Sequence, residues 1–207
     1  MKKTHRIFFF IFFLTAAVLQ SCREEAIPKP PGYFRIDLPA HDYSRFQSSC
    51  EVSLDVPNYA RVEDFKDRQG ADSCWFNISY PRFNATIYCT YFGVNNNVNE
   101  LVQDAYTFAM KHEMKASGVR RTPVEEEASK VFGIIYDIDG EAASQVQFFV
   151  TDSVKHFFRG SLYFNNKPNP DSIAPVLNFV REDIAHMLKS VKWESNSSAS
   201  TPELPSK

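Results

Sequence analysis

The strongest constraint on the fold is a long stretch of alternating apolar and polar residues between Lys130 and Phe164. Every second residue of a β-strand points to the same face, so this alternation indicates strands with one buried face. Two short turn sequences, Asp139-Gly140 and Asp152-Ser153, divide the stretch into three runs. The alternating positions are Phe132, Ile134, Tyr136 and Ile138, then Val146, Phe148 and Val150, then His156, Phe158, Gly160, Leu162 and Phe164. The pattern predicts a three-stranded antiparallel meander.

The residues before this stretch predict further strands and one helix. We expect strands at 33–39, 50–56, 73–80 and 85–92, a polar loop at 61–72, and a helix from Val98 to about Lys115. The asparagines at 95–97 provide an N-cap for that helix, and Gly118 ends it. Residues 119–127 are mostly polar and predict an edge strand.

A second helix follows the meander and completes the domain. It starts near Asp171 and Ser172, with Pro175 in its first turn. Its apolar stripe consists of Ile173, Leu177, Val180, Ile184 and Leu188. Two batches of strands, each followed by a helix, predict an α+β domain with an antiparallel sheet of about six to seven strands and two packed helices. The pattern is similar to the PsbP/Mog1-like fold, a likeness that carries no function by itself.

The N-terminus has the pattern of a bacterial lipoprotein signal peptide. Basic residues within 2–6 precede an apolar run that ends in Leu19-Gln20-Ser21-Cys22. The run is too short to cross a bilayer, which takes about 20 residues, but it suits a signal peptide. We therefore expect residues 1–21 to be removed and Cys22 to be acylated, which anchors the chain in a membrane. The alternative is an uncleaved apolar anchor with an incidental cysteine.

Composition divides the rest of the chain into three parts. Residues 22–32 contain the acylated cysteine and three prolines, which favour an extended and semi-stiff tether. Residues 33–193 are expected to form the single α+β domain. Residues 194–207 are rich in Ser, Pro and Asn, and we expect a disordered tail there.

Charge and motifs exclude several classes of function. Residues 1–21 hold three basic and no acidic side chains, so their removal leaves 20 basic against 25 acidic side chains. This acidic balance, without a basic stripe, argues against nucleic acid as a partner. The sequence has no glycine-rich phosphate or dinucleotide loop, no nucleophile elbow and no helical pair of metal-binding histidines. We therefore expect no cofactor, no metal site and no catalytic residue.

Three cysteines remain besides Cys22, in an oxidising compartment if the signal peptide is genuine. Cys50, Cys74 and Cys89 all share the core-facing parity of their predicted strands. We favour a Cys50–Cys74 disulfide, because the chain makes their strands plausible neighbours. The alternative is three buried thiols that act as small apolar side chains.

Three stretches of the sequence together resemble one family. They are Pro28 to Pro39, Cys74 to Tyr88, and Phe132 to Phe164 with its run DIDGEAASQVQFFVTDSVKHFFRGSLYF. The chain resembles the GldD family of gliding-motility lipoproteins of Bacteroidetes over nearly the whole mature domain. The resemblance implies a noncatalytic accessory of the gliding machinery and the associated type IX secretion system, with the acylated cysteine at Cys22. It also implies a place in the cell envelope, with other Gld-type lipoproteins or secretion-system components as partners. Arg23-Glu24-Glu25 lacks the aspartate that retains lipoproteins at the inner membrane in some bacteria, so we expect an outer-membrane anchor facing the periplasm. The acidic pair leaves surface exposure as the alternative.

Two other classes of function remain open. One is a ligand-binding lipoprotein with an aromatic pocket between sheet and helix for a lipid or a glycan. The other is an envelope hydrolase, which the missing motifs disfavour. For a docking protein, Tyr33, Phe34 and Trp75 are the candidate partner surface. Trp75 has the parity opposite to Cys74 and Phe76, so burial under a helix is its alternative.

Two serines match a short acceptor pattern for O-glycosylation in Bacteroidetes. They are Ser153 in Asp152-Ser153-Val154 and Ser172 in Asp171-Ser172-Ile173. Both also have a purely structural alternative, Ser153 as part of a turn and Ser172 as part of a helix cap.

Overall fold

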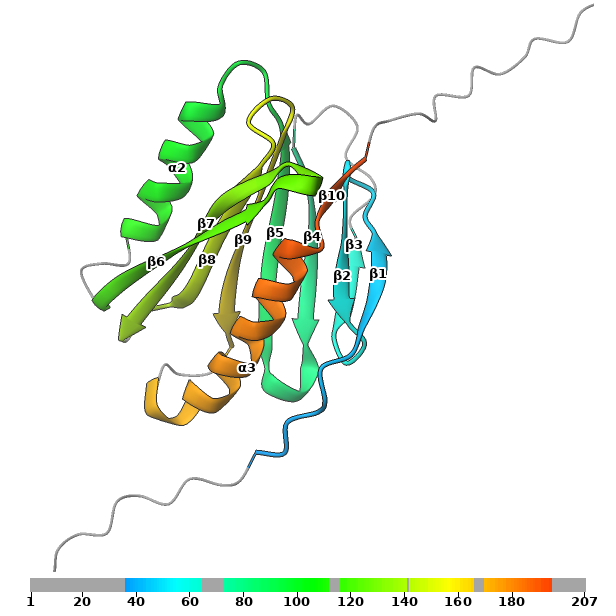
Figure 1. Ribbon diagram of the computed structural model, residues 1–207. Helices are drawn as coiled ribbons and strands as arrows, with labels where there is room; N and C mark the ends of the chain where they lie inside the picture. Colours follow the sequence, from blue (N-terminus) through cyan, green and yellow to red (C-terminus); the bar gives the residue numbers. More distant parts are fainter. Residues whose placement is uncertain (1–35, 65–72, 112–115, 141, 166–169, 195–207) are drawn as a thin grey trace, which may run out of the picture. The chain divides into compact units, whose positions relative to one another are not determined.

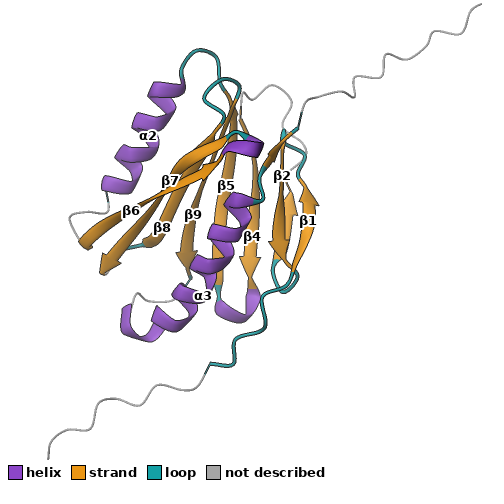
Figure 2. Cartoon of the chain, in the orientation of Figure 1, coloured by secondary structure: helices purple, strands orange, loops and turns teal. Residues whose placement is uncertain are grey.

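The computed structural model describes residues 36–64, 73–111, 116–140, 142–165 and 170–194 (Figure 1). These residues form two antiparallel sheets and two long helices (Figure 2). The larger sheet has seven strands, in the spatial order β3 (Arg61–Asp64), β4 (Ser73–Tyr80), β5 (Ala85–Gly93), β9 (His156–Phe164), β8 (Ser144–Thr151), β7 (Val131–Gly140) and β6 (Ala116–Glu126). The smaller sheet has the order β1 (Tyr43–Gln47), β2 (Val52–Pro57) and β10 (Lys192–Trp193). The helices are α2 (Val98–Met110) and α3 (Pro170–Lys189).

The predicted fold class and the predicted meander are confirmed. The strands β7, β8 and β9 pair in sequence order, and every neighbouring pair in the large sheet is antiparallel. The strand β6 lies at one edge of this sheet, as its polar sequence predicted, because an edge strand is exposed to solvent.

The two faces of the large sheet are covered by different elements, and Figure 1 shows α2 and α3 on opposite sides of it. One face, which we call the α3 face, packs against α3 and the small sheet. Its core includes Phe76, Ile87, Phe148, Phe158 and Leu162 of the large sheet, Val52 and Leu54 of β2, and Val180 and Ile184 of α3. The opposite face, the α2 face, has a smaller core of Tyr136, Phe149 and Phe157 against Ala105 and Ala109 of α2. The helix α2 therefore covers less of the sheet than α3 and the small sheet together.

Three features near the N-terminus differ from the prediction. The predicted loop begins with a strand, β3, which pairs with β4. The predicted strand at 33–39 is wrong for residues 36–39, which have no regular structure, and residues 33–35 lie outside the described residues. The strand β2 belongs to a separate small sheet between β1 and β10. Its alternation is misleading because Ser53, on its polar side, is also buried, at 1 % exposure.

The helices match the prediction along their buried faces and differ at their ends. All five residues of the predicted α3 stripe are buried. The helix α2 ends at Met110, and residues 112–115 of the predicted helix lie outside the described residues. The helix α3 begins at Pro170, so Pro175 lies inside the helix rather than in its first turn. Its ring removes one backbone N–H donor there, which α3 tolerates near its start.

Gly160 of β9 lies directly beneath the aromatic ring of Phe148 in β8. The two residues are paired in register, and a Cβ atom at position 160 would lie 2.3 Å from the Cζ atom of the ring. Phe148 is 3 % exposed and packs in the core of the α3 face, so its ring has little room to move. The ring therefore fills the space that a side chain at position 160 would need.

We predict that Gly160→Ala destabilises the domain by about 1–3 kcal/mol, because overpacking a dense core displaces its neighbours. Urea unfolding of the variant and the native chain measures the difference. Gly93→Ala is the matched control, because a Cβ atom at position 93 in β5 meets nothing within 4 Å. An equal effect of the two substitutions would contradict the packing explanation.

Candidate functional site

A fully buried carboxylate, Asp183 of α3, is the centre of one polar cluster. The hydroxyl of Tyr43 in β1 donates to its Oδ1 atom at 2.9 Å, and the hydroxyl of Tyr59 lies 2.7 and 2.9 Å from its two oxygens. The Nδ1 atom of His41 lies 2.8 Å from Oδ1, while its Nε2 atom lies 3.1 Å from Glu182. The carboxylate thus receives partners from two segments that precede β4, the one that leads into β1 and the one between β2 and β3.

The tyrosine hydroxyls of the Asp183 cluster stay protonated. Burial, and then the hydrogen bond to Asp183, raise the pKa of both Tyr43 and Tyr59 well above the ordinary tyrosine value. The hydroxyls therefore remain donors at physiological pH. Tyr80 is buried beside them, and its hydroxyl has no hydrogen-bond partner among the described residues. A carboxylate with saturated partners suits a structural role, because an unpaired buried charge is costly.

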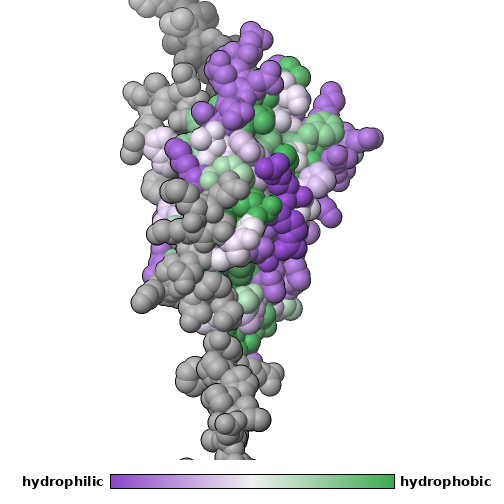
Figure 3. Space-filling view, turned by 90° about the vertical axis from the view of Figure 1, so that its left-hand side faces the viewer, coloured by the Kyte–Doolittle hydropathy of each residue, from purple (hydrophilic) through white to green (hydrophobic). Residues whose placement is uncertain are grey.

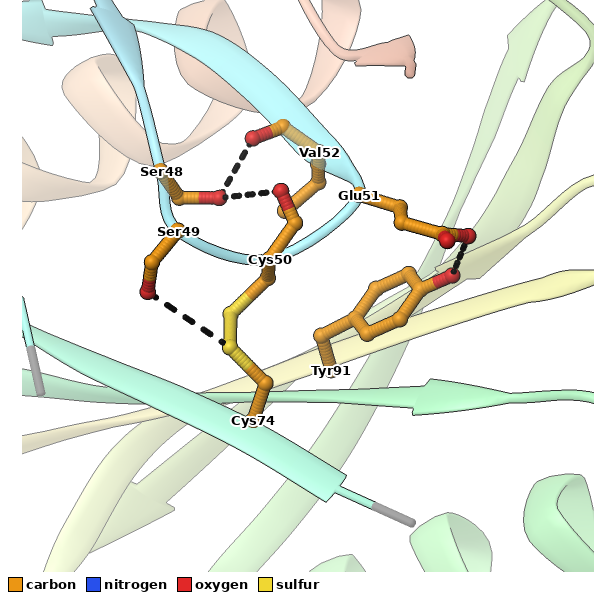
Figure 4. Close-up of a disulfide and its surroundings, with 7 residues drawn as sticks. All are labelled: Ser48, Ser49, Cys50, Glu51, Val52, Cys74 and Tyr91. Atoms are coloured by element: carbon orange, nitrogen blue, oxygen red, sulfur yellow. Dashed lines mark hydrogen bonds between the residues drawn. A yellow bond between two sulfur atoms is a disulfide. The ribbon is translucent and has the colours of Figure 1, made fainter. Parts of the chain in front are cut away.

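A disulfide between Cys50 and Cys74 joins the small sheet to the large one (Figure 4). Their Cα atoms are 5.7 Å apart, with Cys50 just before β2 and Cys74 in β4. This is the pairing that the sequence favours, but the reason differs, because the two strands belong to different sheets. Cys89 is a free and buried thiol in β5, and burial raises its pKa.

A second polar cluster also connects the two sheets. Tyr91 of β5 donates to Glu51 at 3.0 Å (Figure 4), and its hydroxyl lies 2.7 Å from Nδ1 of His156 in β9. The His156 ring stacks on Trp193 of β10, with the ring centres 5.2 Å apart, and the Trp193 indole donates to the carbonyl of Lys130. These side-chain contacts therefore add to the backbone pairing of the short strand β10 with β2.

A cleft of about 700 Å³ lies on the α2 face, beside the C-terminal end of α2. Its floor comes from the central strands β5, β8 and β9 and includes Tyr88, Thr90, Gln147, Arg159, Ser161 and Tyr163. Phe108 of α2 and Lys111, which follows the helix, complete the lining. Figure 3 views the side of the molecule on which α2 lies, and small apolar areas alternate there with hydrophilic ones.

Arg159 is the central cation of this cleft. Its guanidinium lies 5.2 Å from the ring centre of Phe92 and 4.8 Å from that of Phe108. It makes no hydrogen bond and no ion pair within the part of the chain that the structure describes. Burial lowers the pKa of Arg159, and the charge of Asp104 opposes that shift. An arginine still remains charged at physiological pH, so the cleft holds a half-buried positive charge.

The sequence-predicted site residues do not meet in one place. Cys22, Tyr33 and Phe34 lie outside the described residues. Trp75 is half-buried on the α2 face, since its neighbour in the strand packs in the α3-face core. Ser153 is exposed in the turn before β9, whereas Ser172 is half-buried in the first turn of α3. Ser153 is therefore the more accessible of the two predicted acceptors, and both remain predictions.

Comparison with known families identifies the chain. Residues 23–193 match the model of a family described as gliding motility lipoprotein GldD. The chain belongs to the GldD family. This membership makes it a membrane-anchored envelope lipoprotein related to gliding motility, as the sequence resemblance predicted. The match begins directly after Cys22, the residue predicted to be acylated. A search of curated proteins gave no match.

Two searches of the described residues add to the picture of this GldD-family domain. No helix within them combines the length and the apolar character that crossing a membrane requires. Over the same residues, no three His, Cys, Asp or Glu side chains are grouped so that they could hold a metal ion.

Sequence reasoning missed the two most informative charged residues, although each left a signal. Asp183 occupies a stripe position of α3, one residue before Ile184 and four after Phe179, both buried. An acidic residue inside an apolar stripe indicates a buried partner. Arg159 occupies an alternate position in the central strand β9 between Phe157 and Ser161. Neither signal identifies the partner, because the partners come from distant segments.

We predict that Tyr59→Phe lowers the free energy of unfolding by about 1–3 kcal/mol, because it removes a donor to a buried carboxylate. Tyr136→Phe is the matched control and should be close to neutral, since Tyr136 is buried on the α2 face, away from Asp183, and its hydroxyl makes no hydrogen bond among the described residues. Denaturant unfolding at neutral pH measures both. Equal losses in the two variants would contradict the role given to Asp183.

The pH dependence of stability provides a second test of the hydrogen bond between Tyr59 and Asp183. Because the pKa of Tyr59 is raised in the folded state, its contribution is complete below the ordinary tyrosine pKa of about 10 and declines as the pH rises above it. The native chain should therefore lose stability above that pH, and Tyr59→Phe should lose less.

We predict that the double variant Cys50→Ala/Cys74→Ala is less stable by about 2–4 kcal/mol, because the bridge restricts the unfolded chain. Unfolding with and without reductant measures this. Reductant should destabilise the native chain and leave the double variant unchanged. An unchanged stability of the native chain in reductant would contradict the prediction.

Proposed function

We propose that the chain is a noncatalytic structural or assembly component of the gliding-motility and type IX secretion machinery. The observation that carries the proposal is the family match, which spans residues 23–193 and thus the whole predicted mature domain. Acylation of Cys22 anchors this component in the outer membrane, facing the periplasm. Its partners are other Gld-type lipoproteins or secretion-system components.

The partners of three acidic side chains of the domain support a noncatalytic role. Asp183 binds the hydroxyls of β1 and of the segment before β3, and Asp137 of β7 pairs with Arg181 of α3. Asp152 accepts three backbone N–H groups of the turn before β9. Burial alone would raise the pKa of Asp152, but these bonds hold it below the ordinary value. Each carboxylate therefore has a structural partner that would compete with a catalytic role.

The segment that enters the domain supports docking near the tether. Ile36 and Leu38 are large apolar side chains that are 41 % and 39 % exposed. They follow directly after Tyr33 and Phe34, the predicted partner residues, and residues 36–39 have no regular structure. Apolar side chains that remain exposed in an irregular segment are suited to a partner that covers them.

We predict that deleting the gene abolishes colony spreading and the secretion of surface adhesins, and that Cys22→Ala does not restore them. The alanine variant cannot be acylated, so it should also lose its membrane association. Spreading assays, adhesin immunoblots and cell fractionation measure these outcomes.

Ser21→Ala is the matched control, because it keeps a small residue before the cysteine and should complement fully. Normal spreading and secretion in the deletion strain would overturn the proposed function. Full complementation by Cys22→Ala would show that the function does not require the acyl anchor. Crosslinking in the native envelope, followed by mass spectrometry, tests for the expected Gld-type or secretion-system partner.

A further inference from the structure

The cleft on the α2 face contains polar side chains that have no hydrogen-bond partner among the described residues. Within the described ranges, Tyr88, Thr90, Gln147 and Ser161 make no side-chain hydrogen bond. Gln147 is only 6 % exposed, and its side chain lines the cleft. Buried polar groups are normally paired, because leaving them unpaired costs free energy. Several unpaired groups that converge on one cleft are the arrangement found in ligand sites.

The charge of the cleft favours an anionic group in the ligand. Arg159 lies in the floor and Lys111 at the side, and neither makes an ion pair among the described residues. The two rings that contact Arg159 leave its N–H groups unbonded. A carboxylate can accept two parallel N–H bonds from one guanidinium, and partial burial strengthens that pairing.

The aromatic residues of the cleft favour a sugar ring. Tyr88 is 46 % exposed, and its ring meets that of Tyr163 edge to face with the centres 5.7 Å apart. The C–H groups on one side of a pyranose pack against such a ring, while its hydroxyls reach neighbouring polar groups. Ser161 of β9 is paired in register with Tyr88 of β5 on one side and with Gln147 of β8 on the other. The volume of the cleft falls within the usual range for small-ligand sites, about 300–1,000 Å³.

Two other ligand classes fit less well. A lipid chain requires an apolar lining, whereas this floor carries an arginine, a glutamine, a serine and a threonine. A peptide that binds by adding a strand requires an open sheet edge, but β5, β9 and β8 are central strands with both neighbours in place. A ligand in the cleft can therefore be bound only by side chains, and polar and aromatic side chains suit a carbohydrate.

We propose that this cleft binds an acidic glycan, with a carboxylate of the sugar on Arg159 and Lys111 and a sugar ring against Tyr88 and Tyr163. This binding is independent of the role in the gliding machinery, and either can fail without the other. The predicted acidic balance of the mature chain makes the cleft a local exception in charge, which selects for an anionic ligand.

The test uses the complete lipoprotein, purified in a detergent without a sugar headgroup. Isothermal titration calorimetry compares trigalacturonate, its fully methyl-esterified form and hexaglutamate. We expect trigalacturonate to bind and the neutral ester to bind at least about tenfold more weakly, because esterification removes the charge but keeps the ring. Affinity should also fall as salt increases.

Two variants and one control assign the site. Arg159→Gln should weaken trigalacturonate binding by about tenfold or more, and Tyr88→Ala by about fivefold. Arg121→Gln is the control and should stay within about twofold, because Arg121 lies over Tyr106 on the same face but does not line the cleft. Thermal unfolding of each variant shows whether it is folded. If Arg159→Gln does not fold, Tyr88→Ala alone tests the site.

Three results would overturn the proposal. They are no binding of trigalacturonate, equal binding of its ester, and unchanged binding by both Arg159→Gln and Tyr88→Ala. Hexaglutamate that competes with trigalacturonate at equal or higher affinity would instead assign the cleft to acidic peptides and reject the glycan.

Discussion

The burial of one carboxylate determines how the N-terminal part of this domain is assembled. A charge with 0 % exposure needs several donors, and Asp183 obtains them from His41, Tyr43 and Tyr59. His41 and Tyr43 lie at the start of β1 and Tyr59 lies before β3, so one side chain of α3 fixes two segments at once. The small sheet packs against the large one with these segments in place, and the disulfide and the Tyr91 cluster add to the same junction.

Local sequence patterns predicted those parts of the fold that depend on nearby residues. The meander follows from alternation and two turns, and the α3 stripe follows from helical spacing. The small sheet could not be predicted in this way, because β10 pairs with β2 from the other end of the chain. The same limit applies to the cleft, because Arg159 and Tyr88 become neighbours only when β5 pairs with β9. A charged residue in a predicted central strand indicates that it has an unusual environment, but the sequence does not show which residues surround it.

The unequal covering of the large sheet separates structural from accessible polar groups. On the α3 face, buried polar side chains such as Asp183 and Asp137 are paired across elements. On the α2 face, the single helix leaves part of the sheet open, and Tyr88, Thr90, Gln147 and Ser161 of the cleft make no side-chain hydrogen bond among the described residues. The same sheet therefore provides a closed core on one side and an accessible surface on the other.

The position of His41 in the chain has a mechanical consequence. In a protein anchored through Cys22, tension on the anchor reaches His41 before it reaches the first strand at Tyr43. The contacts of His41 with Asp183 and Glu182 pass that tension to α3, whose apolar stripe is packed in the main core. The backbone pairs of β1 are thereby shielded from direct pulling. A domain tethered in this way would thus resist unravelling from its anchored end.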